Sequence, residues 1–220
     1  RKDSGAVTTS HNDMSYDSGY SSGYTRIGFP RPTPAIARLM IVNVAVFVAN
    51  TLLGGRLGEW LALSWAGIQE GYGFGLLRLL SYQFAHSFDD PMHLLYNMVA
   101  LYFFGGIAER GVLGYLGTLK VYLVGGLIGG LAHMGLYGLI LGRSVEVVGA
   151  SGSCYALLIY AVCTKPRMEV WCLFFNFQLI FLGLLMVALG MYQTYVEMLK
   201  GSSLGVSHGA HLGGALLGFG

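Results

Sequence analysis

Six long apolar runs constrain this chain more than any other feature of its sequence. They cover about residues 35–53, 92–107, 119–141, 147–164, 169–192 and 206–220. Runs of this length need lipid or a very large core to cover them, and a chain of 220 residues offers no such core. Mean hydropathy is +0.58 and 11% of residues are charged, against about 25% in an ordinary soluble domain. The sequence therefore predicts an all-α, multi-pass protein whose six transmembrane helices lie in a lipid bilayer.

Composition excludes several other classes of protein. A hydrophobic content of 54% excludes a disordered chain, and the 34 glycines follow no Gly-X-Y period, which excludes collagen. The net charge of +2 is small and scattered, so no nucleic-acid partner is expected. The cysteines Cys154, Cys163 and Cys172 lie in apolar runs and are too few for a disulfide framework.

Two regions differ in composition from the apolar runs. Residues 1–34 are rich in Ser, Gly and Tyr and predict a flexible polar tail, which leaves 35–220 as the membrane domain. The chain starts at Arg1 and stops at Gly220 within an apolar run, so we expect further residues at both ends and a truncated last helix. The connection 54–91 is too long and apolar for a solvated loop. It predicts an interfacial structure of short amphipathic helices between helices 1 and 2.

The distribution of Lys and Arg predicts the orientation in the membrane. With the N-terminus inside, nine of the 13 basic residues fall on the inner side: Arg1, Lys2, Arg26, Arg31, Arg38, Arg110, Lys120, Lys165 and Arg167. Because inner loops carry the excess of positive charge, we expect the N-terminus inside. The tail and this charge bias favour a bacterial plasma membrane, with a mitochondrial inner membrane as the alternative.

The fourth apolar run predicts an unusually short helix. Gly149 and Gly152 make its first residues poor helix formers, so we expect the helix to begin near Ser151 and to end at Thr164. Those residues span about 21 Å, which places the start roughly 10 Å below the outer edge of a ~30 Å hydrocarbon core. Irregular backbone at that depth has to be buried in protein or to line a wet cavity. The sequence therefore predicts a water-accessible pit with Ser151 at its floor.

Small residues indicate which helix packs against this short one. His211, Gly214 and Gly218 fall at i, i+3 and i+7 of the sixth run and share one helical face. Glycines at such spacing let a neighbouring helix approach closely, and Gly152 and Ala156 offer a matching face on the fourth run. This pairing would place His211 against the start of the fourth helix.

The polar residues on these faces suggest nucleophilic catalysis. A serine whose hydroxyl meets an imidazole nitrogen is an activated nucleophile, so Ser151 and His211 are the candidate pair. Tyr155, one turn along from Ser151, is placed to stack on the His211 ring. His93 and Asn97 share a face of the second run and both can donate hydrogen bonds. With the backbone N–H of Ser151 at a helix N-terminus they would form an oxyanion hole.

Taken together, these motifs resemble the rhomboid family of intramembrane serine proteases. The residues that carry the resemblance are Gly149-Ala150-Ser151-Gly152 with Tyr155, His93-x-x-x-Asn97, and Ala210-His211-x-x-Gly214-x-x-x-Gly218. The resemblance implies a six-helix rhomboid-like bundle and a serine endopeptidase that cleaves transmembrane segments through a Ser-His dyad. It implies Ser151 as nucleophile, His211 as general base, His93 and Asn97 as oxyanion donors, and Tyr155, Gly149, Gly152, Gly214 and Gly218 as support. It implies no cofactor, and as substrates single-span membrane proteins that enter past the fifth helix.

The chain departs from the family pattern at two places. Leu77 stands before Arg78 where the family has Trp, and the stretch between His86 and His93 is expanded, so we assign His86 no catalytic role.

Three other functions fit the sequence less well than a protease does. A rhomboid-like pseudoprotease that escorts membrane clients typically lacks the serine or histidine, and this chain has both. A transporter would need charged residues within the first, third and fifth runs, whose middles have none. A metal at His208 and His211 would lack a third ligand. The zinc-protease motif H-E-x-x-H is absent, and all five aspartates lie outside the apolar runs.

Overall fold

The computed structural model describes residues 31–69, 75–172, 175–200 and 207–219. Within it, Pro32–Gly220 forms one unit, and the flexible tail predicted for residues 1–34 lies, up to residue 30, outside the described residues. Helix α1 (Pro34–Leu52) begins with proline at its first position. Its free N-terminal amides are satisfied from another element. The carboxylate of Glu109 accepts from Ala35 N–H at 2.9 and 3.1 Å and from Ile36 N–H at 3.2 Å.

The connection after α1 consists of short helices, as predicted. They are α2 (Arg56–Leu61), α3 (Trp65–Gln69), η1 (Gly75–Leu77), α4 (Arg78–Ser81) and η2 (Tyr82–Phe84). Arg78 holds them together, because its buried guanidinium donates to the carbonyls of Glu59 at 2.8 Å and Ala62 at 2.5 Å. The interfacial location of this connection stays a prediction.

Two helical arms follow and are joined by a turn, and α8 (Ser151–Thr164) packs against both of them. The first contains α5 (Pro91–Ala100), η3 (Leu101–Gly105), α6 (Gly106–Ala108) and η4 (Glu109–Leu113), and the second contains α7 (Gly114–His133) and η5 (Met134–Ile140). The chain turns between them at two glycines. Gly111 has non-helical dihedrals and Gly114 has φ of 59°, a value that L side chains rarely adopt.

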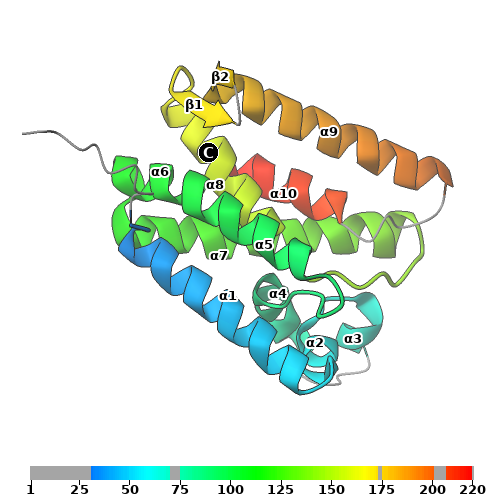
Figure 1. Cartoon of the computed structure of the whole chain (residues 1–220). Helices are drawn as coiled ribbons and strands as arrows, with labels where there is room; N and C mark the ends of the chain where they lie inside the picture. Colours follow the sequence, from blue (N-terminus) through cyan, green and yellow to red (C-terminus); the bar gives the residue numbers. More distant parts are fainter. Residues whose placement is uncertain (1–30, 70–74, 173–174, 201–206, 220) are drawn as a thin grey trace, which may run out of the picture. The chain divides into compact units, whose positions relative to one another are not determined.

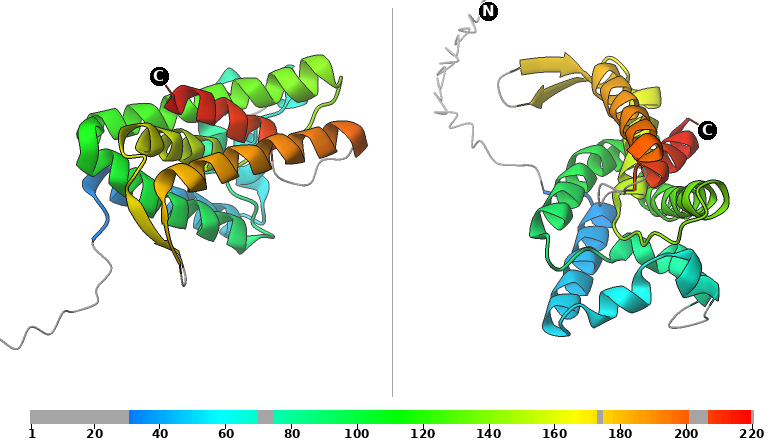
Figure 2. Two further views of the ribbon diagram at one scale, coloured as in Figure 1. Left: turned by 90° about the horizontal axis from the view of Figure 1, so that it is seen from above. Right: turned by 90° about the vertical axis from the view of Figure 1, so that its right-hand side faces the viewer.

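Helix α8 (Ser151–Thr164) has the bounds expected from the sequence. Most of its residues are buried, and Ala156, Leu157 and Ala161 are fully buried. Helix α10 (His208–Gly218) contacts α7, α8 and α9, and Figures 1 and 2 show it beside α8. This packing positions the site described below.

The fifth apolar run is not a single helix, which corrects the all-α prediction. Residues 169–178 form an antiparallel hairpin of β1 (Glu169–Cys172) and β2 (Phe175–Gln178), in which Val170 pairs with Phe177. Helix α9 (Leu179–Lys200) starts ten residues later than the predicted segment and extends beyond its predicted end at 192. The hairpin lies at the end of α8 and the start of α9 (Figure 1). Val170, Trp171, Phe175 and Phe177 are β-branched or aromatic residues, which favour strands.

The apolar helices differ in whether they are long enough to cross a membrane. Among the described residues, three helical stretches are long and apolar enough to cross a membrane, Pro34–Leu52, Pro91–Ile140 and Leu179–Leu199, while Ser151–Thr164 is a shorter apolar helix. The second stretch contains both helical arms. The protein is therefore a mostly helical integral membrane protein, and the count of six crossings and the side of the N-terminus stay predictions.

Candidate active site

Ser151 is placed by a tightly held backbone segment that precedes α8. Val147 and Leu63 exchange two backbone hydrogen bonds of 2.9 and 3.0 Å, and Gly149 N–H donates to the Tyr82 carbonyl at 3.0 Å. Gly149 has φ of 119°, which favours glycine. These bonds stop the extended segment and start the helix at Ser151.

His211 reaches this point because α10 approaches α8 with almost no side chain between them. A Cβ atom at Gly214 would lie 2.0 Å from the Gly152 carbonyl oxygen, and one at Gly218 would lie 2.6 Å from the Ala156 oxygen. Only glycine at these two positions permits the observed approach. The structure thus brings together the small-residue faces that the sequence singled out.

Ser151 and His211 line one pocket, called here the Ser151 pocket. Its volume is about 190 Å³, and its other lining residues are Tyr96, Asn97, Ala100, Phe104, Cys154, Tyr155, Leu158 and Met186. The Tyr155 ring stacks on the His211 ring with centroids 4.5 Å apart and planes 9° apart. His211 is buried, and within the described chain neither of its ring nitrogens has a hydrogen-bond partner.

The expected hydroxyl–imidazole hydrogen bond between Ser151 and His211 is therefore not formed in this structure, although their helices touch. Hydrogen bonds of catalytic pairs are often long in ligand-free enzymes and tighten when substrate binds. The unpartnered nitrogens of His211 leave the ring free to accept a proton at one and to be oriented by Tyr155.

His93 and Asn97 approach the same region from α5. Asp90 caps that helix by accepting from Met92 N–H at 3.1 Å and His93 N–H at 3.3 Å. A Cβ at Gly149 would lie 2.7 Å from His93 Nε2, so the imidazole lies against the segment before Ser151. Asn97 Nδ2 donates to the His93 carbonyl at 2.9 Å, and its second N–H remains for a ligand.

His86 lies next to this group without joining the pocket. Its ring meets the His93 ring edge-on with centroids 5.1 Å apart. Burial, and secondarily the neighbouring His93, lowers the pKa of His86 from 6.5 to about 3. A neutral, buried ring beside His93 is consistent with a structural role.

A second, apolar cavity adjoins the Ser151 pocket. This apolar cleft has a volume of about 300 Å³ and is lined by Tyr96, Val99, Ala100, Phe103, Phe104, Ile107, Val170, Phe177 and Leu182. Tyr96, Ala100 and Phe104 line both cavities. The cleft thus leads from the hairpin and α9 toward Ser151, and Val170 and Phe177 are lining residues that the helical prediction for this stretch missed.

No group of three or more His, Cys, Asp or Glu side chains that could hold a metal ion occurs among the described residues. His208 and His211 meet edge-on with ring centroids 5.4 Å apart. The chemistry available in the Ser151 pocket is that of a hydroxyl, an imidazole and hydrogen-bond donors.

Comparison with known proteins agrees with this geometry. A family model described as the rhomboid domain matches residues 73–220. No curated protein matches the chain at a significant level. The matched stretch includes α5, η3, α8, α9 and α10, which supply the lining of the Ser151 pocket. The chain belongs to the rhomboid family, which is a family of intramembrane serine proteases.

Proposed function

We propose that the protein is an intramembrane serine endopeptidase that uses Ser151 and His211 as a dyad. The observation that carries the proposal is that both side chains line one pocket while Gly214 and Gly152 hold their helices in backbone contact. Tyr155 stacks on the imidazole and fixes the plane of the ring.

The reaction follows from the chemistry of these groups. Ser151 Oγ attacks the scissile carbonyl carbon while His211 accepts the hydroxyl proton. His93, Asn97 and the Ser151 N–H donate hydrogen bonds to the oxyanion of the tetrahedral intermediate. The intermediate collapses to an acyl-enzyme, and the leaving amine takes the proton from His211. Water then attacks the ester with His211 again as base, which releases the second product and restores Ser151.

The proposed substrates are single-span membrane proteins that reach Ser151 through the apolar cleft. An apolar cleft that shares three lining residues with the Ser151 pocket suits a hydrophobic segment better than a soluble peptide. A substrate helix must unwind to expose its carbonyl, so residues that weaken helices near the cut are favoured.

Serine labelling and cleavage test the dyad together. The purified protein is treated with a fluorophosphonate and with a model transmembrane substrate, and Ser151→Ala and His211→Ala are compared with wild type. We expect Ser151→Ala to abolish labelling and each variant to reduce cleavage at least about 10⁴-fold. Ser153→Ala on the same helix and His208→Gln on α10 are matched controls that retain activity. Cleavage that persists in Ser151→Ala would overturn the proposal, and a folded wild type that neither labels nor cleaves would favour a client-binding pseudoprotease.

A further inference from the structure

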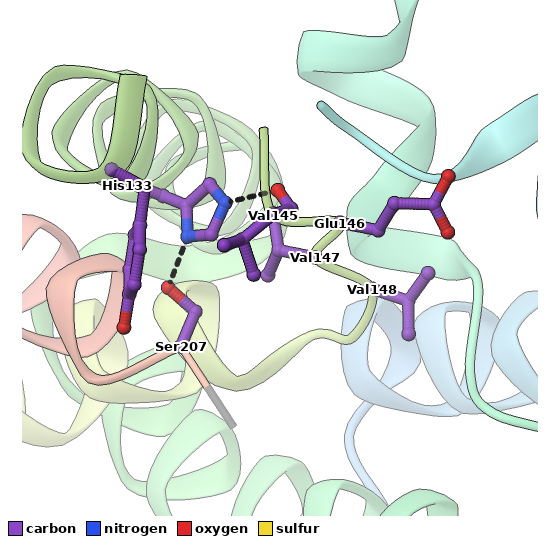
Figure 3. Close-up of a pocket in the computed structure, with 7 residues that line it drawn as sticks. His133, Val145, Glu146, Val147, Val148 and Ser207 are labelled. Atoms are coloured by element: carbon purple, nitrogen blue, oxygen red, sulfur yellow. Dashed lines mark hydrogen bonds between the residues drawn. The ribbon is translucent and has the colours of Figure 1, made fainter. Parts of the chain in front are cut away.

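One histidine outside the Ser151 pocket is bonded to both chain segments that lead to the proposed dyad. His133, the last residue of α7, is 1% exposed. Its Nε2 lies 2.8 Å from the Val145 carbonyl oxygen and its Nδ1 lies 2.6 Å from Ser207 Oγ. Figure 3 shows the imidazole between these two partners, which come from different segments.

The hydrogen-bond roles follow from the partners. A carbonyl oxygen can only accept, so Nε2 of His133 carries the proton that it donates to Val145. In the neutral ring Nδ1 is then an acceptor, and the Ser207 hydroxyl donates to it. Ser207 Oγ in turn accepts from Ala210 N–H at 3.2 Å and so caps the N-terminus of α10. A continuous chain of hydrogen bonds joins the backbone at Val145 to the first turn of α10.

Each end of this series of hydrogen bonds leads directly to one member of the proposed dyad. Val145 begins the segment that passes through the Val147–Leu63 bridge and reaches Ser151. Ser207 is followed one turn later by His211, whose N–H bonds the Ser207 carbonyl at 3.3 Å. A shift of Val145 relative to Ser207 would therefore change the separation of the nucleophile and the base.

Packing alone does not fix these two segments against each other. A cavity of about 40 Å³ separates them, lined by His133, Tyr137, Val145, Glu146, Val147, Val148 and Ser207 (Figure 3). The Tyr137 ring packs against the His133 ring with centroids 4.7 Å apart and holds it from one side. Because a cavity and not a side chain adjoins the imidazole on this side, its two hydrogen bonds supply the connection that side-chain contacts would otherwise give.

We propose that His133 is a positioning residue that, through Val145 and Ser207, sets the distance between Ser151 and His211. The proposal rests on the proposed dyad. A misplacement of about 1 Å between reacting groups can cost about 10²-fold in rate, whereas the apolar cleft that binds the substrate helix contains neither His133 nor Ser207. Loss of the connection therefore lowers kcat and leaves KM unchanged.

The test compares His133→Leu, Ser207→Ala and the double variant with wild type in detergent. We expect each single variant to lower kcat and the rate of fluorophosphonate labelling about tenfold or more, with KM unchanged. Since both residues belong to one connection, the double variant loses no more than His133→Leu alone. Ser207→Thr keeps the hydroxyl and rescues the rate, which a general loss of packing would not explain. Thr118→Val is the matched control, because Thr118 is fully buried and the variant removes its partly buried 2.8 Å hydrogen bond to the Gly114 carbonyl at the other end of α7.

Two results would overturn the proposal. One is His133→Leu that labels at the wild-type rate, and the other is a variant that raises KM while kcat stays unchanged. If His133→Leu fails to fold, Ser207→Ala against Ser207→Thr decides the question with the histidine intact, and equal labelling of those two rejects the connection. Failure of the dyad itself is recognised separately, because wild type would then not label at Ser151.

Discussion

Helices α10 and α9 flank α8 in contrasting ways. Against α10, backbone meets backbone, since a Cβ at Gly214 would stand 2.0 Å from the Gly152 oxygen. Against α9, large side chains meet and space remains, because Leu182 lines the apolar cleft of about 300 Å³ and Met186 lines the Ser151 pocket of about 190 Å³. The two proposed reacting groups thus lie on the tightly packed pair of helices, α8 and α10, and the proposed substrate route runs along the loosely packed helix α9.

The largest effect is expected from a substitution that breaks the close contact between α10 and α8. Gly214→Ala places a methyl group against the Gly152 carbonyl, where backbone cannot yield, so we expect about 3 kcal/mol of destabilisation and loss of cleavage. Gly190→Ala on α9 is the matched control, because its Cβ would meet the Leu212 side chain at 3.4 Å, an ordinary contact. Thermal unfolding in detergent and substrate cleavage measure both variants. Equal stability of the two would remove the distinction between the helices.

A second prediction concerns the proposed oxyanion donor His93, which lies against the segment that precedes α8. Gly149→Ala adds a Cβ that would lie 2.7 Å from His93 Nε2 at a backbone φ of 119°. We expect cleavage to fall about 10²-fold, because removal of one oxyanion donor has a cost of that size. Gly142→Ala supplies the control for strain alone, since φ there is 62° and nothing lies within 4 Å of the added Cβ. Similar activity in both variants would argue that His93 has no part in the reaction.

A third prediction concerns the buried His86 and the pH dependence of the protein's stability. The pKa of His86 is lowered from 6.5 to about 3, so below pH 6.5 the unfolded chain binds a proton there that the folded chain does not. His86 therefore contributes its maximum to the free energy of unfolding above pH 6.5. As the pH drops toward 3, this contribution falls by at most about 1.4 kcal/mol per pH unit. His86→Leu should flatten that part of the profile, measured by chemical unfolding at several pH values. An unchanged slope would contradict the burial effect.

The smallest expected effect concerns the loosely packed side. Leu182→Trp fills part of the apolar cleft, so we expect KM for a transmembrane substrate to rise about tenfold, about 1.4 kcal/mol, while labelling by a small fluorophosphonate is unchanged. Leu184→Trp on the same helix is the control, since Leu184 is 60% exposed and does not line the cleft. A loss of labelling in Leu182→Trp would show that the cleft and the Ser151 pocket are coupled more rigidly than their packing indicates.

The close packing of α10 on α8 was predictable from the sequence, because small residues at fixed spacing leave few ways for two helices to pack. The spacing of His211, Gly214 and Gly218 and the glycines around Ser151 predict both the pairing of α10 with α8 and the start of α8. These are local patterns, and close helix contact requires them.

The hairpin beside α9 and the hydrogen bonds of His133 were not predictable in the same way. An apolar run such as 169–178 is compatible with a buried helix and with strands, and hydropathy does not separate the two. The contact of His133 with Ser207 joins residues 74 positions apart, and nothing in the local sequence of either residue indicates the other. Such contacts become visible only once the helices are placed.

The capping of α1 by Glu109 has a consequence for the order in which the bundle closes. The amides at the start of α1 are satisfied by a carboxylate 74 positions further along the chain. The start of α1 therefore gains its hydrogen bonds only after the turn that carries Glu109 has been synthesised and has docked. Helix α1 is thus completed by a turn that is synthesised after it, and its N-terminal turn reports on whether that later docking has taken place.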